Sequence, residues 1–307
     1  MAPDLVRPMD FAARYGTGLD RTLVLGGGGV FFIGWQTAYL AASADAGIDL
    51  AGADRVVGTS AGSLVGSLLC AGRLNHLARL ADVFTRAKGL ISFLAPVGDF
   101  HPSQQRALDL LLAAADNEPA TLREIGHAAL AAQTPSARTM RRNVGLLVDS
   151  RRWPGGDDRL AITCVDAFSG ERLVVDRRAG VRARAAVAAS SALPGIFAPQ
   201  LIHDRRCMDG GISGSGTHCD LVAGSRRAVV LSMAGDEPLP QAMGATPVDA
   251  MPRELAGLRA SGAALFFRSP AVPDGYNIMA PESLQEGLTM GRQQAAADID
   301  ELREFWS

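Results

Sequence analysis

The sequence predicts an α/β protein: a three-layer α/β/α sandwich around a mainly parallel sheet, with a helical cap inserted into it. Short aliphatic runs that suit strands buried on both faces alternate with helical segments, as in parallel sheets covered by helices. The chain has 307 residues, of which 48% are hydrophobic and 20% are charged. This composition excludes a mainly disordered chain and supplies enough apolar surface for a large core.

A strand, helix, strand, helix order is predicted for the first 72 residues. Residues 22–25 form an aliphatic run that ends in four glycines, and residues 33–45 place apolar side chains at helical spacing. Residues 55–58 repeat the strand pattern, and residues 61–71 form a mostly apolar segment closed by Gly72, which suits a helix.

The middle of the chain is predicted to form the helical cap. Residues 74–87, 102–115 and 120–132 suit helices, and a proline lies at or near the start of two of them. Residues 138–159 are polar and rich in turn-forming residues, with arginines interspersed among aspartates. We expect this last stretch to be a solvated loop.

The alternation then resumes and continues to the end of the chain. Strands are predicted over residues 160–165, 172–176, 228–232 and 264–267, and helices over residues 181–189, 253–260 and 282–305. No linker divides the sequence. We therefore expect residues 1–20 to be an N-terminal extension and residues 21–307 to form one domain.

Charge, cysteines and the first residues exclude several classes of protein. The net charge of −2 gives no field that would attract the chain to nucleic acid, so we expect no nucleic-acid partner. The four cysteines lack C-x-x-C spacing and the first 20 residues lack the apolar stretch of a secretory signal, so we expect reduced thiols in a cytoplasmic protein. Neither H-E-x-x-H nor a calcium-loop motif occurs, so we expect no metal and no organic cofactor.

A nucleophile elbow is the first candidate functional motif. Gly58-Thr59-Ser60-Ala61-Gly62 matches G-x-S-x-G and lies between a predicted strand and a predicted helix. Glycines at both ends allow a sharp turn that holds the Ser60 hydroxyl out of the chain, at the positive end of the helix. The alternative is a turn of small residues that only packs a helix on a strand.

A glycine loop is the second candidate. Four glycines, residues 26–29, follow the first strand, and their backbone N–H groups could point at an anionic oxygen. A dinucleotide-binding loop would need Gly or Ala at position 31 or 32, where the chain has Phe31 and Phe32. The Gly-Lys-Ser/Thr end of a phosphate-binding loop is also absent, whereas an oxyanion hole needs only two convergent amides.

The residues alone leave the partner of Ser60 open. A Ser-His-Asp triad would combine Ser60 with Asp166 or Asp176 and with His203 or His218. The G-x-S-x-G motif follows only two predicted strands, however, whereas α/β-hydrolases with such a triad usually have several strands before it.

An acidic turn offers another partner. Asp209 is followed by Gly210 and Gly211, and two glycines after an acid allow the backbone to approach the carboxylate closely. Taken alone, such a turn is weak evidence, because most Asp-Gly turns are simply turns.

Four motifs occur together in order: LVLGGGGV at residues 23–30, GTSAGS at 58–63, ALPGIFAP at 192–199 and MDGG at 208–211. This combination resembles the patatin-like phospholipase family. The resemblance covers residues 23–232 and implies that residues 21–307 form a patatin-like acyl hydrolase domain, with a C-terminal strand and helix in residues 253–305.

The resemblance implies a Ser-Asp dyad in which Ser60 is the nucleophile and Asp209 takes its proton, and in which the amides of Gly27, Gly28 and Gly29 form the oxyanion hole. Gly210 and Gly211 would support the turn. The reaction would be hydrolysis of a lipid or other fatty-acyl ester through an acyl-enzyme. An Asp with an ordinary pKa of about 3.9 is a weak base at neutral pH, so either apolar surroundings raise its pKa or proton transfer is concerted with attack. A lipid substrate is also compatible with transient contact with a membrane surface.

One departure from the family pattern concerns the end of the glycine loop. The family usually has a basic residue and then a glycine where this chain has Phe31 and Phe32, so a phosphate-holding or loop-fixing role of that basic residue does not carry over to this chain. With Trp35 these rings could form an apolar acyl site, or they could be ordinary helix packing. Three functions therefore remain open: an acyl hydrolase, an acyltransferase or thioesterase with the same dyad, and a catalytically silent lipid-binding protein.

Overall fold

A computed structural model describes residues 4–74, 100–148, 153–154, 159–238, 245–273 and 275–307. Within these residues, eight strands form one sheet in the order β5-β6-β3-β2-β1-β7-β8, and β4 pairs with β3 beside this path. The strands are β1 (Arg21–Leu25), β2 (Arg55–Gly58), β3 (Leu160–Asp166), β4 (Arg172–Val175), β5 (Gln200–Ile202), β6 (Arg205–Asp209), β7 (Arg227–Leu231) and β8 (Ala264–Arg268).

The centre of the sheet is parallel, as predicted. Strands β3, β2, β1, β7 and β8 run in one direction, while β4 and β6 are antiparallel to β3. Successive side chains of a strand point to opposite faces of the sheet and pack in different apolar clusters. In β1, Leu23 and Leu25 belong to one cluster and Val24 belongs to another. A strand that is buried on both faces needs apolar residues at every position, which explains the uninterrupted aliphatic runs in the sequence.

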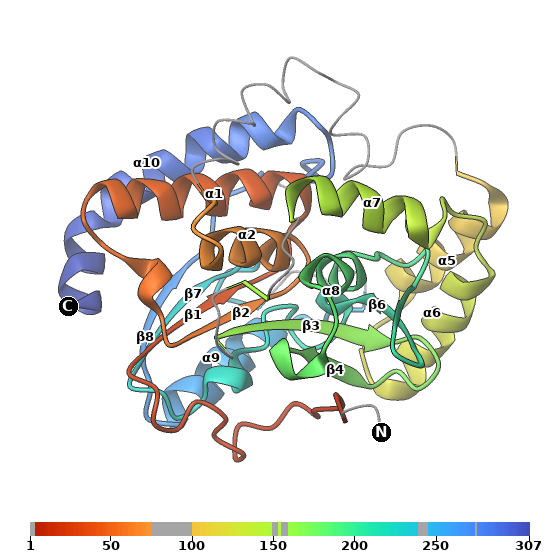
Figure 1. Ribbon diagram of the computed structural model, residues 1–307, viewed down its shortest axis with the longest axis horizontal. Helices are drawn as coiled ribbons and strands as arrows, with labels where there is room; N and C mark the ends of the chain where they lie inside the picture. The colour runs from red at the N-terminus through yellow and green to blue at the C-terminus, as the bar shows by residue number, and fades with distance from the viewer. Residues whose placement is uncertain (1–3, 75–99, 149–152, 155–158, 239–244, 274) are drawn as a thin grey trace.

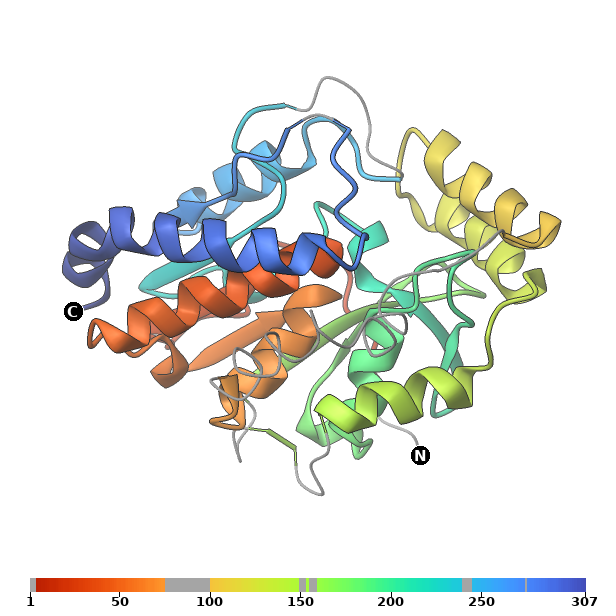
Figure 2. The same ribbon diagram turned by 90° about the horizontal axis from the view of Figure 1, so that it is seen from above.

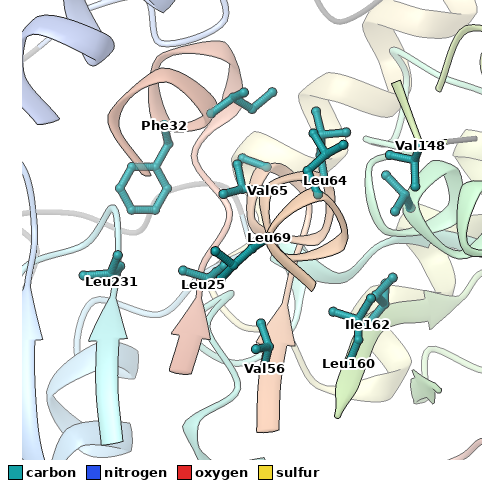
Figure 3. Packing of buried hydrophobic residues seen from close by; sticks show 14 of the residues in the cluster. Leu25, Phe32, Val56, Leu64, Val65, Leu69, Val148, Leu160, Ile162 and Leu231 are labelled. Atoms are coloured by element: carbon teal, nitrogen blue, oxygen red, sulfur yellow. The ribbon is translucent and has the colours of Figure 1, made fainter. Parts of the chain in front are cut away.

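Helices cover both faces of the sheet and make three layers (Figure 1). One face carries α1 (Gly29–Asp45), α2 (Ala61–Cys70), α7 (Ala137–Leu147), α8 (Ala183–Ser190) and α10 (Ser283–Trp306), and the other carries α9 (Ala250–Ala260). Figure 3 shows Leu64, Val65 and Leu69 of α2 above Leu25 of β1 and Val56 of β2. The three-layer α/β/α prediction is confirmed.

Helices α1 and α10 lie side by side with their backbones in close contact (Figure 2). The contact depends on glycines, because a Cβ on Gly287 or Gly291 of α10 would collide with a carbonyl oxygen of α1. A third glycine, Gly34, faces α10 from the α1 side in the same way. This close packing buries the long apolar side chains of α1 between the sheet and α10.

The cap contains α5 (Pro102–Ala113) and α6 (Pro119–Ala131), both near the predicted positions. The predicted helix over residues 74–87 lies outside the described residues apart from its first residue. The solvated loop predicted for residues 138–159 is wrong in its first part, because that part belongs to α7, which has an arginine-rich outer face and buries Met140, Val144 and Leu147. No helix in the described ranges is both long and apolar enough to cross a bilayer.

The N-terminal segment before β1 packs against the body of the protein. Val6 bridges to Leu173 of β4, and Phe11 and Tyr15 pack against the apolar cluster on the α9 face. Four short 3₁₀ helices complete the described elements: η1 (Leu50–Gly52), η2 (Arg177–Ala179), η3 (Gly210–Ile212) and η4 (Cys219–Val222).

Candidate active site

A cavity of about 350 Å³ opens where β1, β2, β6 and β7 end. Its walls are mainly apolar side chains from both the sandwich and the cap, including Leu64, Leu111, Met140, Val144, Leu147 and Val187. Among the described lining residues, Asp209 is the only one with an ionisable side chain. The cavity therefore has mainly apolar walls and, in its described lining, a single ionisable group, Asp209, and we call the end where Asp209 lies the reactive end.

Ser60 lies at this reactive end in a strained turn between β2 and α2. Its backbone has φ 50° and ψ −115°, a conformation that few residues with a Cβ adopt. Gly58 and Gly62 make the turn sterically possible: a Cβ at Gly58 would lie 2.6 Å from the Gly62 carbonyl oxygen, and one at Gly62 would collide with the backbone of β1. This is the geometry of a nucleophile elbow.

Two serine hydroxyls hold the elbow in place. The Ser60 N–H donates to Ser190 Oγ at 2.8 Å, and Ser63 Oγ donates to the Ser60 carbonyl oxygen at 2.7 Å. Neither Ser190 nor Ser63 was identified as a site residue from sequence. Ser63 falls inside the GTSAGS motif and Ser190 falls just before ALPGIFAP, so their neighbourhood was the only signal available.

Asp209 ends β6 and faces Ser60. The Ser60 hydroxyl donates to Asp209 Oδ2 at 2.8 Å, although the two residues are 149 positions apart. The other carboxyl oxygen, Oδ1, accepts the Gly211 N–H at 2.7 Å, and the Asp209 N–H donates to the Ala192 carbonyl at 3.0 Å. A Cβ at Gly210 would lie 2.5 Å from the Thr163 carbonyl oxygen, so this turn requires glycine.

Burial changes the acid–base character of Asp209. Removal from water raises the pKa of Asp209 from 3.8 to about 7, although the hydrogen bonds from Gly211 and Ser60 act in the opposite direction. A carboxylate with a pKa near 7 is a far better base at neutral pH than an ordinary aspartate. A pKa raised by burial is one of the two conditions under which Asp209 could act as a base.

The N–H groups of the glycine loop, residues 26–29, fall into two groups: two donate to backbone carbonyls of the residues that the structure describes, and two do not. Gly26 N–H donates to Leu231 O at 2.9 Å, and Gly27 N–H donates to Gly216 O at 3.3 Å. No acceptor is recorded within the described chain for the N–H groups of Gly28 and Gly29, both of which line the cavity. Of the three amides proposed for an oxyanion hole, those of Gly28 and Gly29 are therefore the better placed to bind a new ligand.

The structure does not assemble the alternative triad. His203 is exposed and donates from Nε2 to Ala179 O, whereas His218 is buried and contacts the Gly210 carbonyl. Asp166 pairs with Arg205 and Asp176 pairs with Arg178. In the described part of the chain no histidine is hydrogen-bonded to Ser60.

The predicted acyl-site aromatics require a correction. Phe31, Phe32 and Trp35 are fully buried on α1 and do not belong to the described lining of the cavity. Phe31 packs edge-on against Tyr276, and Phe32 stacks on Trp35. The packing interpretation is thus the correct one, because α10 and the segment before it cover this side of α1.

The apolar wall instead comes from residues that the sequence argument did not identify. Met140, Val144 and Leu147 of α7 line the cavity together with Val187 of α8. Their spacing of four and then three residues in α7 is a helical signal. It was hidden by the many arginines that surround it.

Comparison with known proteins places the chain in a family. The model of the family described as patatin-like phospholipase matches residues 23–217. No curated protein is similar enough in sequence to match. Two similar solved structures are the type III effector protein ExoU (19% identity, TM-score 0.38, 94% of this chain and 54% of that chain) and VipD from Legionella pneumophila (12%, 0.41, 96% and 68%). The chain thus spans about half of the ExoU structure. On the family match, this chain belongs to the patatin-like phospholipases.

Proposed function

We propose that this protein is a serine acyl hydrolase that cleaves fatty-acyl esters of lipids, with Ser60 as nucleophile and Asp209 as general base. The observation that carries the proposal is the 2.8 Å hydrogen bond from the Ser60 hydroxyl to Asp209, at the reactive end of an apolar cavity. The family match independently supports a lipid ester as the substrate.

In the first half-reaction, Ser60 Oγ transfers its proton to Asp209 Oδ2 as it attacks the ester carbonyl carbon. The carbonyl oxygen becomes negative and is stabilised by the amides of Gly28 and Gly29, each worth about 2.7–4 kcal/mol by analogy with other oxyanion holes. Asp209 then gives its proton to the departing alcohol, which leaves an acyl group on Ser60. In the second half-reaction, a water molecule attacks the acyl carbonyl carbon and gives a proton to Asp209 Oδ2. The bond from that carbon to Ser60 Oγ then breaks, Ser60 Oγ takes the proton back from Asp209, and the carboxylic acid is released.

The acid–base properties of Asp209 support this role. The reaction needs the carboxylate form, and the pKa of about 7 places its loss near neutral pH. We therefore expect kcat/KM to fall as the pH drops through about 7, since that parameter reports the free enzyme.

The walls of the cavity favour an acyl chain over a polar group. The lining residues of α7 and α8 are all apolar, and the polar lining residue Ser191 follows the end of α8. Each methylene buried there contributes about 0.8 kcal/mol, or about a fourfold gain in kcat/KM, until the cavity is full.

Hydrolysis of p-nitrophenyl esters of graded chain length tests the proposal, with Ser60→Ala and Asp209→Asn as the site variants. We expect the wild type to turn over and to react with a fluorophosphonate probe, and Ser60→Ala to do neither. Asp209→Asn should lose most activity while remaining folded. A folded wild type that is as inactive as both variants would refute the proposal and favour a lipid-binding protein.

A further inference from the structure

His218 is a buried histidine that the proposed reaction does not use. It follows the Asp209 turn by nine residues, is completely inaccessible to solvent, and has a left-handed backbone with φ 62°. Its Nε2 lies 3.0 Å from Gly210 O, and its Nδ1 lies 3.2 Å from Arg172 Nη1. A residue with a left-handed backbone that is buried and fully hydrogen-bonded is often found near a functional site, and the contact with Gly210 places His218 next to the Asp209 turn.

The two partners of His218 fix its tautomer. A guanidinium can only donate, so Arg172 Nη1 donates to an unprotonated Nδ1. A carbonyl can only accept, so the proton is on Nε2 and is donated to Gly210 O. Burial and the neighbouring Arg172 also lower the pKa of His218 to about 3, so the ring is neutral at working pH.

The peptide group that His218 contacts is the one that holds Asp209. The Gly210 carbonyl and the Gly211 N–H belong to a single planar peptide, and in a trans peptide they point in opposite directions. His218 binds the oxygen of this peptide at 3.0 Å, while its N–H donates to Asp209 Oδ1 at 2.7 Å. The orientation of the ring therefore fixes the direction in which the amide reaches the carboxylate.

Arg172 anchors the other side of the ring. It forms two 2.7 Å bonds to the carboxylate of Asp220, and its remaining donors reach the carbonyls of Arg7 at 2.8 Å and Pro8 at 3.0 Å. Arg172 and Asp220 are both buried, and each neutralises the charge of the other. The N-terminal segment is thereby connected to the same network.

We propose that His218 is a positioning residue for Asp209, which acts through the Gly210–Gly211 peptide and is itself held by Arg172 and Asp220. This inference rests on the proposed function, in which Asp209 is the general base. Hydrogen bonds in such a chain polarise one another, so a ring held by a cation makes the Gly211 N–H a stronger donor.

The consequence is a measurable shift in the titration of Asp209. The Gly211 hydrogen bond lowers the pKa of Asp209, so weakening it raises that pKa. Among the described residues, Cys164 of β3 lies opposite Asp209 in the sheet, and a hydrogen bond with Cys207 and burial raise the pKa of its thiol well above the ordinary value. The Arg172–Asp220 ion pair lies behind His218. A neutral substitution at His218 changes none of their charges.

His218→Asn is the test variant, since Asn tolerates a left-handed backbone and still reaches Arg172 but is too short to reach Gly210. His218→Gln is the rescue variant, because its longer amide supplies both a donor and an acceptor. His218→Gly, which suits the same backbone, provides a second deletion. The matched control is His203→Asn: His203 also has positive φ, at 53°, and also donates to a backbone carbonyl, but it lies on the β5–β6 turn.

The measurement is the pH profile of kcat/KM between pH 5 and 9 for each folded variant. For His218→Asn and His218→Gly we expect the acid limb to move up by about one pKa unit, because weakening a hydrogen bond to a charged group removes part of the stabilisation of the carboxylate form. Activity at pH 7 then falls about fivefold, and the deficit almost vanishes at pH 9. His218→Gln should return to within about twofold of wild type, and His203→Asn should match it.

Two outcomes would overturn the proposal: an acid limb that does not move, or an activity deficit that is equal at every pH and is not rescued by Gln, since that indicates a merely structural role. A carbon-13 NMR titration of the Asp209 carboxyl, assigned by its loss in Asp209→Asn, gives a readout without turnover. If the wild type hydrolyses no ester, the proposed function fails, and this titration still decides the role of His218.

Discussion

Asp209→Asn should be more stable relative to the wild type at alkaline pH than at acidic pH. The folded state raises the pKa of Asp209 from 3.8 to about 7, mainly by burial, so folding is opposed by ionisation of this group. The stabilisation that comes from protonated Asp209 in the folded state is therefore fully present below pH 3.8 and is lost as the pH rises through 7. Asn has nearly the same shape and does not ionise, so it removes this dependence.

The size of the effect follows from the two pKa values. Between pH 5 and pH 7 the unfolded chain has released the proton while the folded chain still holds it. Each pH unit in this window costs the folded wild type about 1.36 kcal/mol, so the total is about 2.7 kcal/mol. For a chain of 307 residues this corresponds to a Tm difference of about 4 °C.

The assay is urea unfolding of wild type and Asp209→Asn at pH 5 and pH 8. The free-energy gap between the two proteins should shift by about 2.7 kcal/mol in favour of the Asn variant at the higher pH. Other buried acids such as Glu254, whose pKa burial also raises, titrate in both proteins and cancel in the comparison. A gap that is the same at both pH values would refute the argument that Asp209 is a base tuned by burial.

Three further predictions concern packing, charge and substrate choice. Gly287→Ala should lower stability by about 1–3 kcal/mol, because the new Cβ collides with the Phe31 carbonyl, whereas an ordinary helix would gain stability from Ala; a higher Tm would contradict the close contact of α1 and α10. Asp220→Asn should cost about 3–5 kcal/mol in urea unfolding, since it leaves the Arg172 guanidinium buried without its counter-charge, and a loss under 1 kcal/mol would mean that the pair is dispensable. Val144→Trp should fill part of the cavity and lower the ratio of long-chain to short-chain ester turnover at least about tenfold, and an unchanged ratio would mean that the acyl chain lies elsewhere.

The reactive turns could be predicted because their rules are local. A strand, a sharp turn and a helix within a few residues require glycine at Gly58 and Gly62, and the structure has no room for a Cβ at either position. The meeting of Ser60 with Asp209 was different, since no spacing rule connects residues 149 positions apart. That pairing came from the family resemblance.

The errors have physical causes that lie outside any short window of sequence. Phe31 and Trp35 looked available to a ligand because the helix that buries them comes more than 240 residues later. Residues 138–147 are predicted from sequence to be part of a loop because one face of α7 is rich in arginine, while its apolar stripe is only a few residues wide. The amide of Gly27 is likewise occupied by a distant carbonyl, that of Gly216.

Because α1 packs closely against α10, we expect the segment that carries the four sequence motifs not to fold without the C-terminal part of the chain. Cutting the chain at residue 217, where the family match ends, would strip away β7, β8 and the whole of α10. The indole of Trp35 and the phenol of Tyr39 would then become exposed to solvent, and the cavity would lose Ile278 and Met279 from its wall. We therefore expect the smallest fragment that folds to be considerably longer than the segment matched by the family model.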